Sequence, residues 1–332
     1  MNSQDYRLPD VRRIVTGHNS EMRACVIYDG VSPKIEVRES GIVSTLIWGT
    51  KSCPAEITGS EDLGNQNNNL QPPPQGSWFR IVDFPPGAPG FMHRTDTIDY
   101  AICMEGEIDM EMDDGRTVHV RPHDILVQLG TNHSWINRGT QTCRIAFVLI
   151  DGKRVGAKPR GPGPQRLKEI ETLPDGKKAF LDPVRRIVTT HDQNGSAIIM
   201  HDGLAPQRMW REPRGNISTL IWGTDETPAE LLSPEDFGLR ENDIEPQSDG
   251  SWVRVIDYPA KMTGRMHRTD SIDYAVCLCG EMEMELDDGR AVTFRAGDVM
   301  VQRATNHSWI NKRDEPARIV FALLGSESPA QA

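Results

Sequence analysis

The chain has few of the features by which several classes of protein are recognised. Its 332 residues include 37 Lys and Arg against 48 Asp and Glu, a net charge of −11, and no basic cluster is interleaved with aromatic residues. This balance argues against nucleic acid or an anionic membrane surface as a partner. No apolar run approaches the length of a membrane span or of a signal peptide, so we expect a cytoplasmic protein.

The chain also has few cysteines at matching places in its two halves, few segments with helical periodicity and none of the common catalytic motifs. Of the six cysteines, only Cys103 and Cys277 occupy matching places in the two halves of the chain. A disulfide framework would be shared by both halves, so we expect reduced thiols. The chain lacks a GxSxG nucleophile elbow, a Walker loop, a zinc ribbon and a dinucleotide-binding fingerprint, and nucleophilic catalysis therefore has no support. Almost no segment has the period of an amphipathic helix.

The most informative feature that is present is an internal repeat. The stretch HRTDTIDYAICMEG at His93–Gly106 returns as HRTDSIDYAVCLCG at His267–Gly280, which begins 174 residues later. Of the 24 residues that begin with each of these histidines, 17 are identical. The heptapeptide TNHSWIN follows at the same offset, from Thr131 and from Thr305. A period of this length indicates a duplicated domain and not a solenoid.

We therefore expect domains at residues 11–150 and 184–325, joined by a linker at 151–183 that is rich in Pro and Gly. Within each domain, short runs such as GSWFRIVDF and GSWVRVIDY alternate apolar and polar residues. Asp-Gly pairs, such as Asp29-Gly30, predict hairpin turns. Many short strands separated by Gly, Pro and Asp predict an all-β sandwich or barrel.

Histidines and a carboxylate recur at matching places in both halves. Strand alternation puts His93 and Thr95 on one face, and puts His133 and Trp135 on one face of another strand, while Asp99 begins the next strand. Inside a barrel, two imidazoles and a carboxylate form a candidate 2-His-1-carboxylate metal site. The pattern also allows histidines held by main-chain groups, an aspartate that pairs with a neighbouring arginine or orients a histidine, and a tryptophan that only packs.

These residues resemble the motifs of the cupin superfamily, the first of which is G-x5-H-x-H-x3-E-x6-G. Its positions are occupied by Gly87, His93, Thr95, Asp99 and Gly106, and again by Lys261, His267, Thr269, Asp273 and Gly280. The second motif corresponds to Pro122, Asp124, His133 and Asn137, and to Gly297, Asp298, His307 and Asn311. Threonine replaces the second histidine of the family and aspartate replaces its glutamate. The resemblance implies a bicupin, with two double-stranded β-helix (jelly-roll) barrels in one all-β chain, and with opening strands exchanged between the halves or packed where they meet.

The resemblance also implies a metal-dependent enzyme, similar to small cupin-domain oxidoreductases. We expect a divalent metal ion, with Fe(II) favoured over Zn(II) or Mn(II). The expected ligands are His93, Asp99, His133, His267, Asp273 and His307. Gln128 and Gln302 are expected to orient a substrate as catalytic residues, and Thr95, Trp135, Thr269 and Trp309 to contact it. The alternatives are that the glutamines form hydrogen bonds at a strand edge and that the threonines only fill space.

The expected function is a non-haem Fe(II) dioxygenase or other oxidoreductase that acts on a small aromatic or carbonyl compound. The alternatives are a Zn- or Mn-dependent lyase, isomerase or decarboxylase of the same fold, and a non-catalytic bicupin that binds a small molecule. A homo-oligomer is a further expectation. His119, His123 and His201 have no counterpart in the other half and are expected at the surface.

Overall fold

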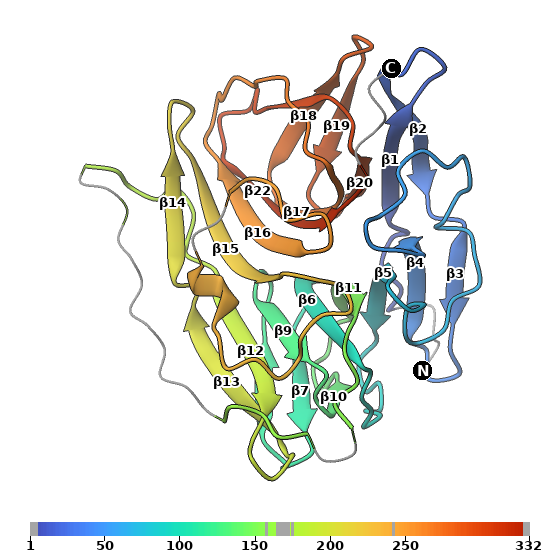
Figure 1. The fold of residues 1–332 in the computed structure, drawn as a ribbon, viewed down its shortest axis with the longest axis vertical. Coiled ribbons are helices and arrows are strands. Elements are labelled where there is room, and N and C mark those ends of the chain that lie inside the picture. Colours follow the sequence, from blue (N-terminus) through green and yellow to red (C-terminus); the bar gives the residue numbers. More distant parts are fainter. Residues whose placement is uncertain (1–5, 157–158, 164–172, 174–175, 241–242, 328–332) are drawn as a thin grey trace.

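The structure is a computed structural model that describes residues 6–156, 159–163, 173, 176–240 and 243–327. Its strands form two successive sets, coloured blue to green and yellow to red in Figure 1. The first set comprises β1 (Arg12–His18), β2 (Ala24–Val31), β3 (Lys34–Val37), β4 (Val43–Thr50), β5 (Ser77–Phe84), β6 (Thr97–Glu105), β7 (Ile108–Met112), β8 (Thr117–Val120), β9 (Ile125–Leu129), β10 (His133–Ile136) and β11 (Cys143–Asp151). The second comprises β12 (Arg185–His191), β13 (Ala197–Leu204), β14 (Gln207–Arg211), β15 (Asn216–Thr224), the short 3-10 helix η1 (Phe237–Leu239), β16 (Ser251–Tyr258), β17 (Ser271–Cys279), β18 (Glu281–Leu286), β19 (Ala291–Arg295), β20 (Val299–Arg303), β21 (His307–Ile310) and β22 (Ala317–Gly325).

Each barrel consists of an eight-stranded sheet and a three-stranded sheet. In the N-terminal barrel the orders are β13-β12-β9-β6-β11-β5-β4-β3 and β10-β7-β8. In the C-terminal barrel they are β2-β1-β20-β17-β22-β16-β15-β14 and β19-β18-β21. The expected all-β chain with two barrels is confirmed. The described residues contain no helix that is long and apolar enough to cross a membrane.

The opening strands of the two halves are exchanged, as one of the two expected arrangements has it. Strand β1 runs parallel to β20, with Ile14 opposite Met300, and β12 runs parallel to β9, with Ile187 opposite Leu126. Figure 1 shows the blue β1 beside the red β20. Ile14 and Ile187 are fully buried, each in the apolar core of the barrel that its strand joins. Each barrel is therefore completed by a segment of the other half.

A third apolar core joins the two barrels. It contains residues of both halves, and within it the rings of Phe79 and Tyr274 stack with centroids 5.0 Å apart. The hydroxyl of the buried Tyr274 lies 2.8 Å from Ser77 Oγ, so the polar end of this ring is also satisfied across the boundary. Burial of large apolar surface stabilises the pair of barrels as one unit.

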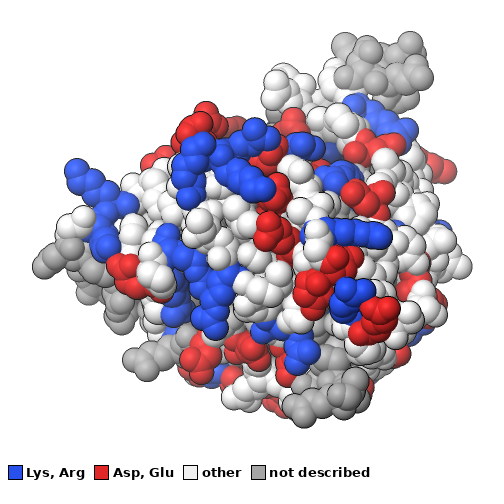
Figure 2. Space-filling model, turned by 90° about the horizontal axis from the view of Figure 1, so that it is seen from above, with Lys and Arg blue, Asp and Glu red and all other residues white. Residues whose placement is uncertain are grey.

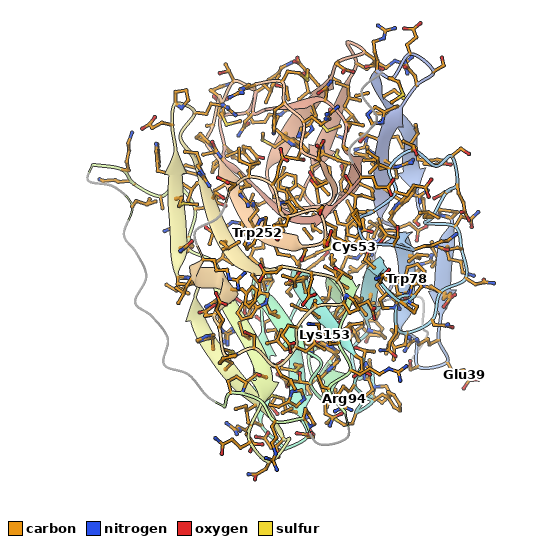
Figure 3. The ribbon with its side chains drawn as sticks, in the orientation of Figure 1. Glu39, Cys53, Trp78, Arg94, Lys153 and Trp252 are labelled. Carbon is orange, nitrogen blue, oxygen red and sulfur yellow. The ribbon has the colours of Figure 1, made fainter. Side chains whose placement is uncertain are left out.

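Loops reinforce this boundary at its edge. Cys53 Sγ donates to the main-chain carbonyl of Asp249 at 3.2 Å, and Lys153 Nζ lies 2.6 Å from a carboxylate oxygen of Glu226. In Figure 3, Cys53 and Lys153 lie near the middle of the molecule, where the two sets of strands meet. These contacts join residues far apart in sequence and add to the apolar core between the barrels.

The predicted turn at Asp29-Gly30 is wrong. The chain turns at Asn19–Arg23, where Asn19 Oδ1 accepts a hydrogen bond of 3.0 Å from the main-chain N–H of Arg23. Asp29 instead lies within β2, where its carboxylate accepts a hydrogen bond of 2.7 Å from Arg12 Nε. An Asn side chain forms hydrogen bonds with nearby main-chain groups and so favours a turn, as an Asp-Gly pair does. Asn19 therefore begins the turn ten residues before Asp29.

The expectation that His201 lies at the surface is also wrong. His201 on β13 is buried, with Nε2 3.2 Å from a carboxylate oxygen of Asp236, whereas His119 is exposed and His123 is half-buried. Asp236 also holds Arg186 of β12 through two contacts of 2.6 and 2.8 Å. The exchanged hairpin of β12 and β13 is thus held in place by the buried carboxylate of Asp236, which lies on a loop in the same half of the chain.

Candidate functional site

A pair of histidines lies at the same place in each barrel. The main-chain groups of His93 and His133 bond to each other in both directions, at 3.0 and 2.9 Å, and the two ring centroids are 4.4 Å apart. His267 and His307 repeat this arrangement, with centroids 4.5 Å apart. Each pair thus comes from two segments that strand pairing holds side by side, which orients both rings toward one place.

The hydrogen bonds of these rings select one tautomer. Nδ1 of His93 lies 2.8 Å from the carbonyl oxygen of Phe91, and Nδ1 of His133 lies 2.9 Å from that of Thr131. A carbonyl only accepts, so Nδ1 is the donor and Nε2 of the neutral ring keeps its lone pair. His267 and His307 have the same contacts with the carbonyls of residues 265 and 305, at 2.9 and 2.8 Å. A main-chain carbonyl is one of the usual hydrogen-bond partners of a histidine that binds a metal.

Burial keeps the inner ring of each pair neutral. Loss of solvent lowers the pKa of His133 to about 3, and the neighbouring His93 lowers it further. The pKa of His307 falls to about 4 for the same two reasons, burial first and then His267. Both rings therefore remain available as electron-pair donors well below neutral pH.

In the metal-free protein, His133 and His307 are expected to stay neutral at pH 5 with the proton on Nδ1. With pKa values of about 3 and about 4, roughly nine-tenths or more of each ring is unprotonated at that pH. Long-range ¹H–¹⁵N NMR of ¹⁵N-histidine-labelled protein reports tautomer and charge directly. His119 is the internal control, because the hydrogen bonds that its ring donates to Asp109 and Glu107 raise its pKa and should leave it protonated. An imidazolium signal from His133 at pH 5 would contradict the arrangement.

The buried carboxyl groups bond to neighbouring hydroxyls. Thr97 Oγ1 donates to Asp99 at 2.5 Å and Thr95 Oγ1 lies 3.4 Å from it. Burial raises the pKa of Asp99 to about 6, against the opposing effects of the Thr97 hydrogen bond and the charge of Arg80. In the second barrel, Ser271 Oγ donates to Asp273 at 2.5 Å, and burial raises the pKa of Asp273 to about 7. Each pocket thus holds a carboxyl group that gains and loses a proton near neutral pH.

The donor atoms fit a metal ion only in part. Among the residues that the structure describes, no three His, Cys, Asp or Glu side chains come close enough together to hold one ion. His93 and His133 line one pocket and supply two nitrogen lone pairs, while Asp99 lines the same pocket without forming a three-residue group with them. The two imidazoles of each barrel therefore fit a metal ion, with its other positions left to water or substrate. Asp99 and Asp273 as ligands stay a prediction.

Both histidine pairs open on a pocket. The N-terminal pocket has a volume of about 240 Å³ and the C-terminal pocket about 340 Å³. His93, Thr95, Asp99, His133 and Trp135 line the first, and His267, Thr269, Asp273, His307 and Trp309 line the second. Volumes of this order hold a small organic molecule. All the expected ligands and contact residues are thus gathered at two pockets.

The two glutamines lie elsewhere. Gln128 and Gln302 stand directly opposite Asp99 and Asp273 across a strand pair, but they do not line either pocket. Gln128 Nε2 lies 3.8 Å from Met110 Sδ, and its Oε1 is buried without a partner among the described residues. Strand neighbours can project to the same face and still differ in depth, so alternation alone did not locate these side chains.

A buried arginine in each pocket was missed by the sequence reasoning. Arg80 on β5 is 6% exposed, and Nη2 donates to the carbonyl of Asn69 at 2.9 Å. Burial lowers the pKa of Arg80 to about 10, while the charge of Asp99 partly offsets this effect. Arg254 on β16 repeats the position. The signal was available, because an arginine recurs in the middle of GSWFRIVDF and GSWVRVIDY, where the apolar pattern predicts burial.

Comparisons with known proteins relate the chain to cupin-domain proteins. No family model matches it. Cupin-domain-containing oxidoreductase fogC of Aspergillus ruber is 36% identical over 152 residues, which cover 44% of this chain and 74% of that protein. Cupin-domain-containing oxidoreductase virC of Hypocrea virens is 35% identical over 158 residues, with coverages of 44% and 80%. Oryzines biosynthesis cluster protein J of Aspergillus oryzae is 32% identical over 154 residues, with coverages of 44% and 86%.

Solved structures give matches over most of the chain. The cupin 2 conserved barrel domain protein from Leptotrichia buccalis matches 88% of this chain and 97% of its own, with a TM-score of 0.45 and 11% identity. A variant of Bacillus subtilis oxalate decarboxylase OxdC matches 89% and 76%, with a TM-score of 0.44 and 13% identity. Since relatives that carry the cupin name align at 35 and 36% identity over most of their own length, this chain belongs to the cupin superfamily, as a protein with two barrels.

Proposed function

We propose that the protein is a metal-dependent cupin oxidoreductase that acts on a small aromatic or carbonyl compound, with Fe(II) as the favoured metal and a dioxygenase reaction as the favoured chemistry. The observation that carries the proposal is the duplicated histidine pair, in which hydrogen bonds to carbonyls leave Nε2 of both rings as electron-pair donors at a pocket. Two relatives bear the name oxidoreductase, which supports the same class of reaction.

His93 and His133 would hold the metal ion in the N-terminal barrel, and His267 and His307 in the C-terminal barrel. A divalent ion there supplies Lewis-acid polarisation of a substrate oxygen and, as Fe(II), redox chemistry with O₂. Trp135 lies with its ring centroid 6.3 Å from that of His133 and offers the apolar wall that excludes water from the reacting part of the substrate.

The buried polar groups bind and orient. The Arg80 guanidinium would attract an acidic or carbonyl oxygen of the substrate, because its Nε is buried without a partner among the described residues. Asp99, hydrogen-bonded to Thr97 and with its pKa raised to about 6, would accept or return a proton at its carboxylate oxygen during the reaction. Gln128 lies outside the pocket lining and would act on the substrate only through Asp99, its neighbour across the strand pair.

Metal binding tests the proposal. Anaerobically loaded protein is expected to retain two Fe(II) per chain, the single variant His133→Ala one, and the double variant His133→Ala/His307→Ala none. Loss of a direct ligand should weaken binding by at least about 100-fold, since even outer partners of a ligand contribute about 10- to 100-fold. Metal is counted by mass spectrometry of the desalted protein, and Mn(II) and Zn(II) are loaded in parallel.

His119→Ala is the control, because His119 is exposed and lies outside both pocket linings. It should leave the metal content unchanged. If the double variant keeps the metal content and the small-molecule binding of the parent protein, the proposed enzyme is contradicted. The hypothesis that remains is a non-catalytic bicupin that binds a small molecule.

A lyase or isomerase that uses Zn(II) or Mn(II) is the second candidate. The raised pKa values of Asp99 and Asp273, about 6 and about 7, favour it, because such carboxyl groups exchange protons with a substrate at neutral pH. Isotopes separate the two functions: a dioxygenase transfers ¹⁸O from O₂ into the product, and a lyase or isomerase exchanges solvent deuterium without consuming O₂.

A further inference from the structure

The two pockets differ in polarity although their barrels are repeats. Residues of the two halves that are 174 positions apart correspond to each other. The apolar residues Ile42, Phe84 and Phe91 line the N-terminal pocket, and at the corresponding places the C-terminal pocket has Asn216, Tyr258 and Arg265. Each difference puts a polar or charged group where the other pocket has only carbon.

Arginines gather at the C-terminal pocket. Its lining includes Arg211, Arg214, Arg254 and Arg265, whereas the N-terminal lining includes Arg38 and Arg80. Figure 2 views the molecule from the end at which the C-terminal barrel lies, and basic side chains are prominent on its left, the side of β14 and β15 in Figure 1. The hairpin between β14 and β15 carries Arg211 and Arg214, so it brings two of these charges to the mouth of the pocket.

Three of these guanidiniums have no anionic partner within the described part of the chain. Arg211 Nη2 is buried without a hydrogen bond, and the side chains of Arg214 and Arg265 form neither a hydrogen bond nor an ion pair with a described residue. Elsewhere in the same barrel, Arg318 is held at 2.6 Å by the buried Asp257. In a protein with a net charge of −11, unpaired arginines that converge on one cavity are suited to an anion from outside the chain.

The acidic groups of the pocket do not neutralise these arginines. Glu212 forms an ion pair with Lys177 at 2.9 Å and accepts a hydrogen bond from Trp210, so its charge is already satisfied. Asp273 accepts a short hydrogen bond from Ser271 Oγ and lies deep among the buried residues. The cavity therefore keeps a positive field at its mouth.

The inner wall of the same pocket is apolar and aromatic. Trp309 packs against Phe321 with ring centroids 5.8 Å apart, and Leu323 completes this side of the lining. Such a wall favours the flat or apolar body of a ligand, and guanidinium groups bind carboxylate oxygens through two parallel hydrogen bonds.

We propose that the C-terminal pocket binds a small organic dianion, with two acidic groups on an aromatic or carbonyl skeleton, whereas the N-terminal pocket takes a less charged and more apolar compound. The inference deepens the proposed function, since it names the ligand class of one of the two proposed sites and rests on that pocket being a ligand site. It requires no metal ion, because the charges and the wall belong to the chain itself.

Calorimetry of the metal-free protein tests the inference with isophthalate, benzoate and benzyl alcohol, which carry two, one and no negative charges on one ring. Isophthalate is expected to bind at one site per chain and about tenfold more tightly than benzoate, a difference of about 1.4 kcal/mol. Arg265→Phe introduces, at an exposed position, the residue that Phe91 provides in the other barrel. It should weaken isophthalate binding about tenfold and benzoate binding less than about threefold. Arg214→Gln should act in the same direction.

The reciprocal variant Phe91→Arg should add a second isophthalate site, which raises the stoichiometry from one to two. Arg290→Gln is the matched control, since it removes an exposed arginine that is absent from both pocket linings. Isophthalate that binds no more tightly than benzoate, or that is unaffected by both Arg265→Phe and Arg214→Gln, overturns the inference. Selective isophthalate binding in a protein that retains no metal would refute the proposed function alone. Metal retention without this selectivity would refute the inference alone.

Discussion

Separate expression of residues 1–170 and residues 171–332 is expected to yield two pieces that aggregate or misassemble, while co-expression should restore a 1:1 particle. The reason is the exchange of strands. Without its partner, the C-terminal piece lacks β1 beside β20, and the N-terminal piece lacks β12 beside β9. Both pieces would expose an unpaired strand edge in an incomplete barrel. Such an edge pairs readily with strands of other chains. The apolar core between the barrels would be exposed as well.

Size-exclusion chromatography with light scattering, together with circular dichroism, measures this result. The matched control is the full chain with a protease site between residues 170 and 171, cleaved only after folding. This nicked protein should remain 1:1 and melt close to the intact one, because every strand is already in place. A monomeric half with its own cooperative melting transition would show that the exchange is not needed for folding.

Asp236→Ala is expected to lower the free energy of unfolding by about 3–5 kcal/mol, the usual cost of removing one partner from a buried ion pair. The side chains of Arg186 and Asp236 are 1% and 6% exposed and form two contacts of 2.6 and 2.8 Å. The alanine would leave the guanidinium buried without its anion. It would also remove the contact with His201, which lies 3.2 Å from Asp236.

Urea unfolding followed by tryptophan fluorescence measures this change. Glu61→Ala is the control, because Glu61 and its partner Lys51 are 63% and 55% exposed, and such pairs change stability by less than about 1 kcal/mol. Replacement of both buried partners, Arg186→Met with Asp236→Leu, should recover much of the loss, because an apolar pair of similar volume needs no charge compensation. An Asp236→Ala variant no less stable than Glu61→Ala would show that the pair does not stabilise the exchanged hairpin.

Much of the site could be predicted from the sequence because its geometry is local to paired strands. His133 and Trp135 share a strand face by simple alternation, and the repeated TNHSWIN stretch predicts the same for His307 and Trp309. The structure adds the partner strand, which places His93 directly opposite His133. A duplicated motif with period-two alternation thus predicted which rings face a pocket.

Other features depended on contacts that alternation does not describe. Gln128 lies opposite Asp99 and yet outside the pocket lining, with its Nε2 3.8 Å from Met110 Sδ. Burial of His201 depends on the loop that carries Asp236, which lies 35 residues further along the chain. Arg80 lies within the apolar strand β5, whose pattern predicts burial of the strand but not of a guanidinium at a pocket.

The sequence by itself determined the β class, the duplication and the positions of the histidine pairs, because all three follow from period-two alternation and from one constant offset. Tertiary structure alone decided that β1 completes the C-terminal barrel and β12 the N-terminal one, since either barrel offers an apolar edge of the same pattern. It also decided that Asp99 accepts a hydrogen bond from Thr97, and that Arg211, Arg214 and Arg265 meet at one cavity. A sequence pattern sets the face on which a side chain lies, whereas the packing of distant strands sets which side chains meet.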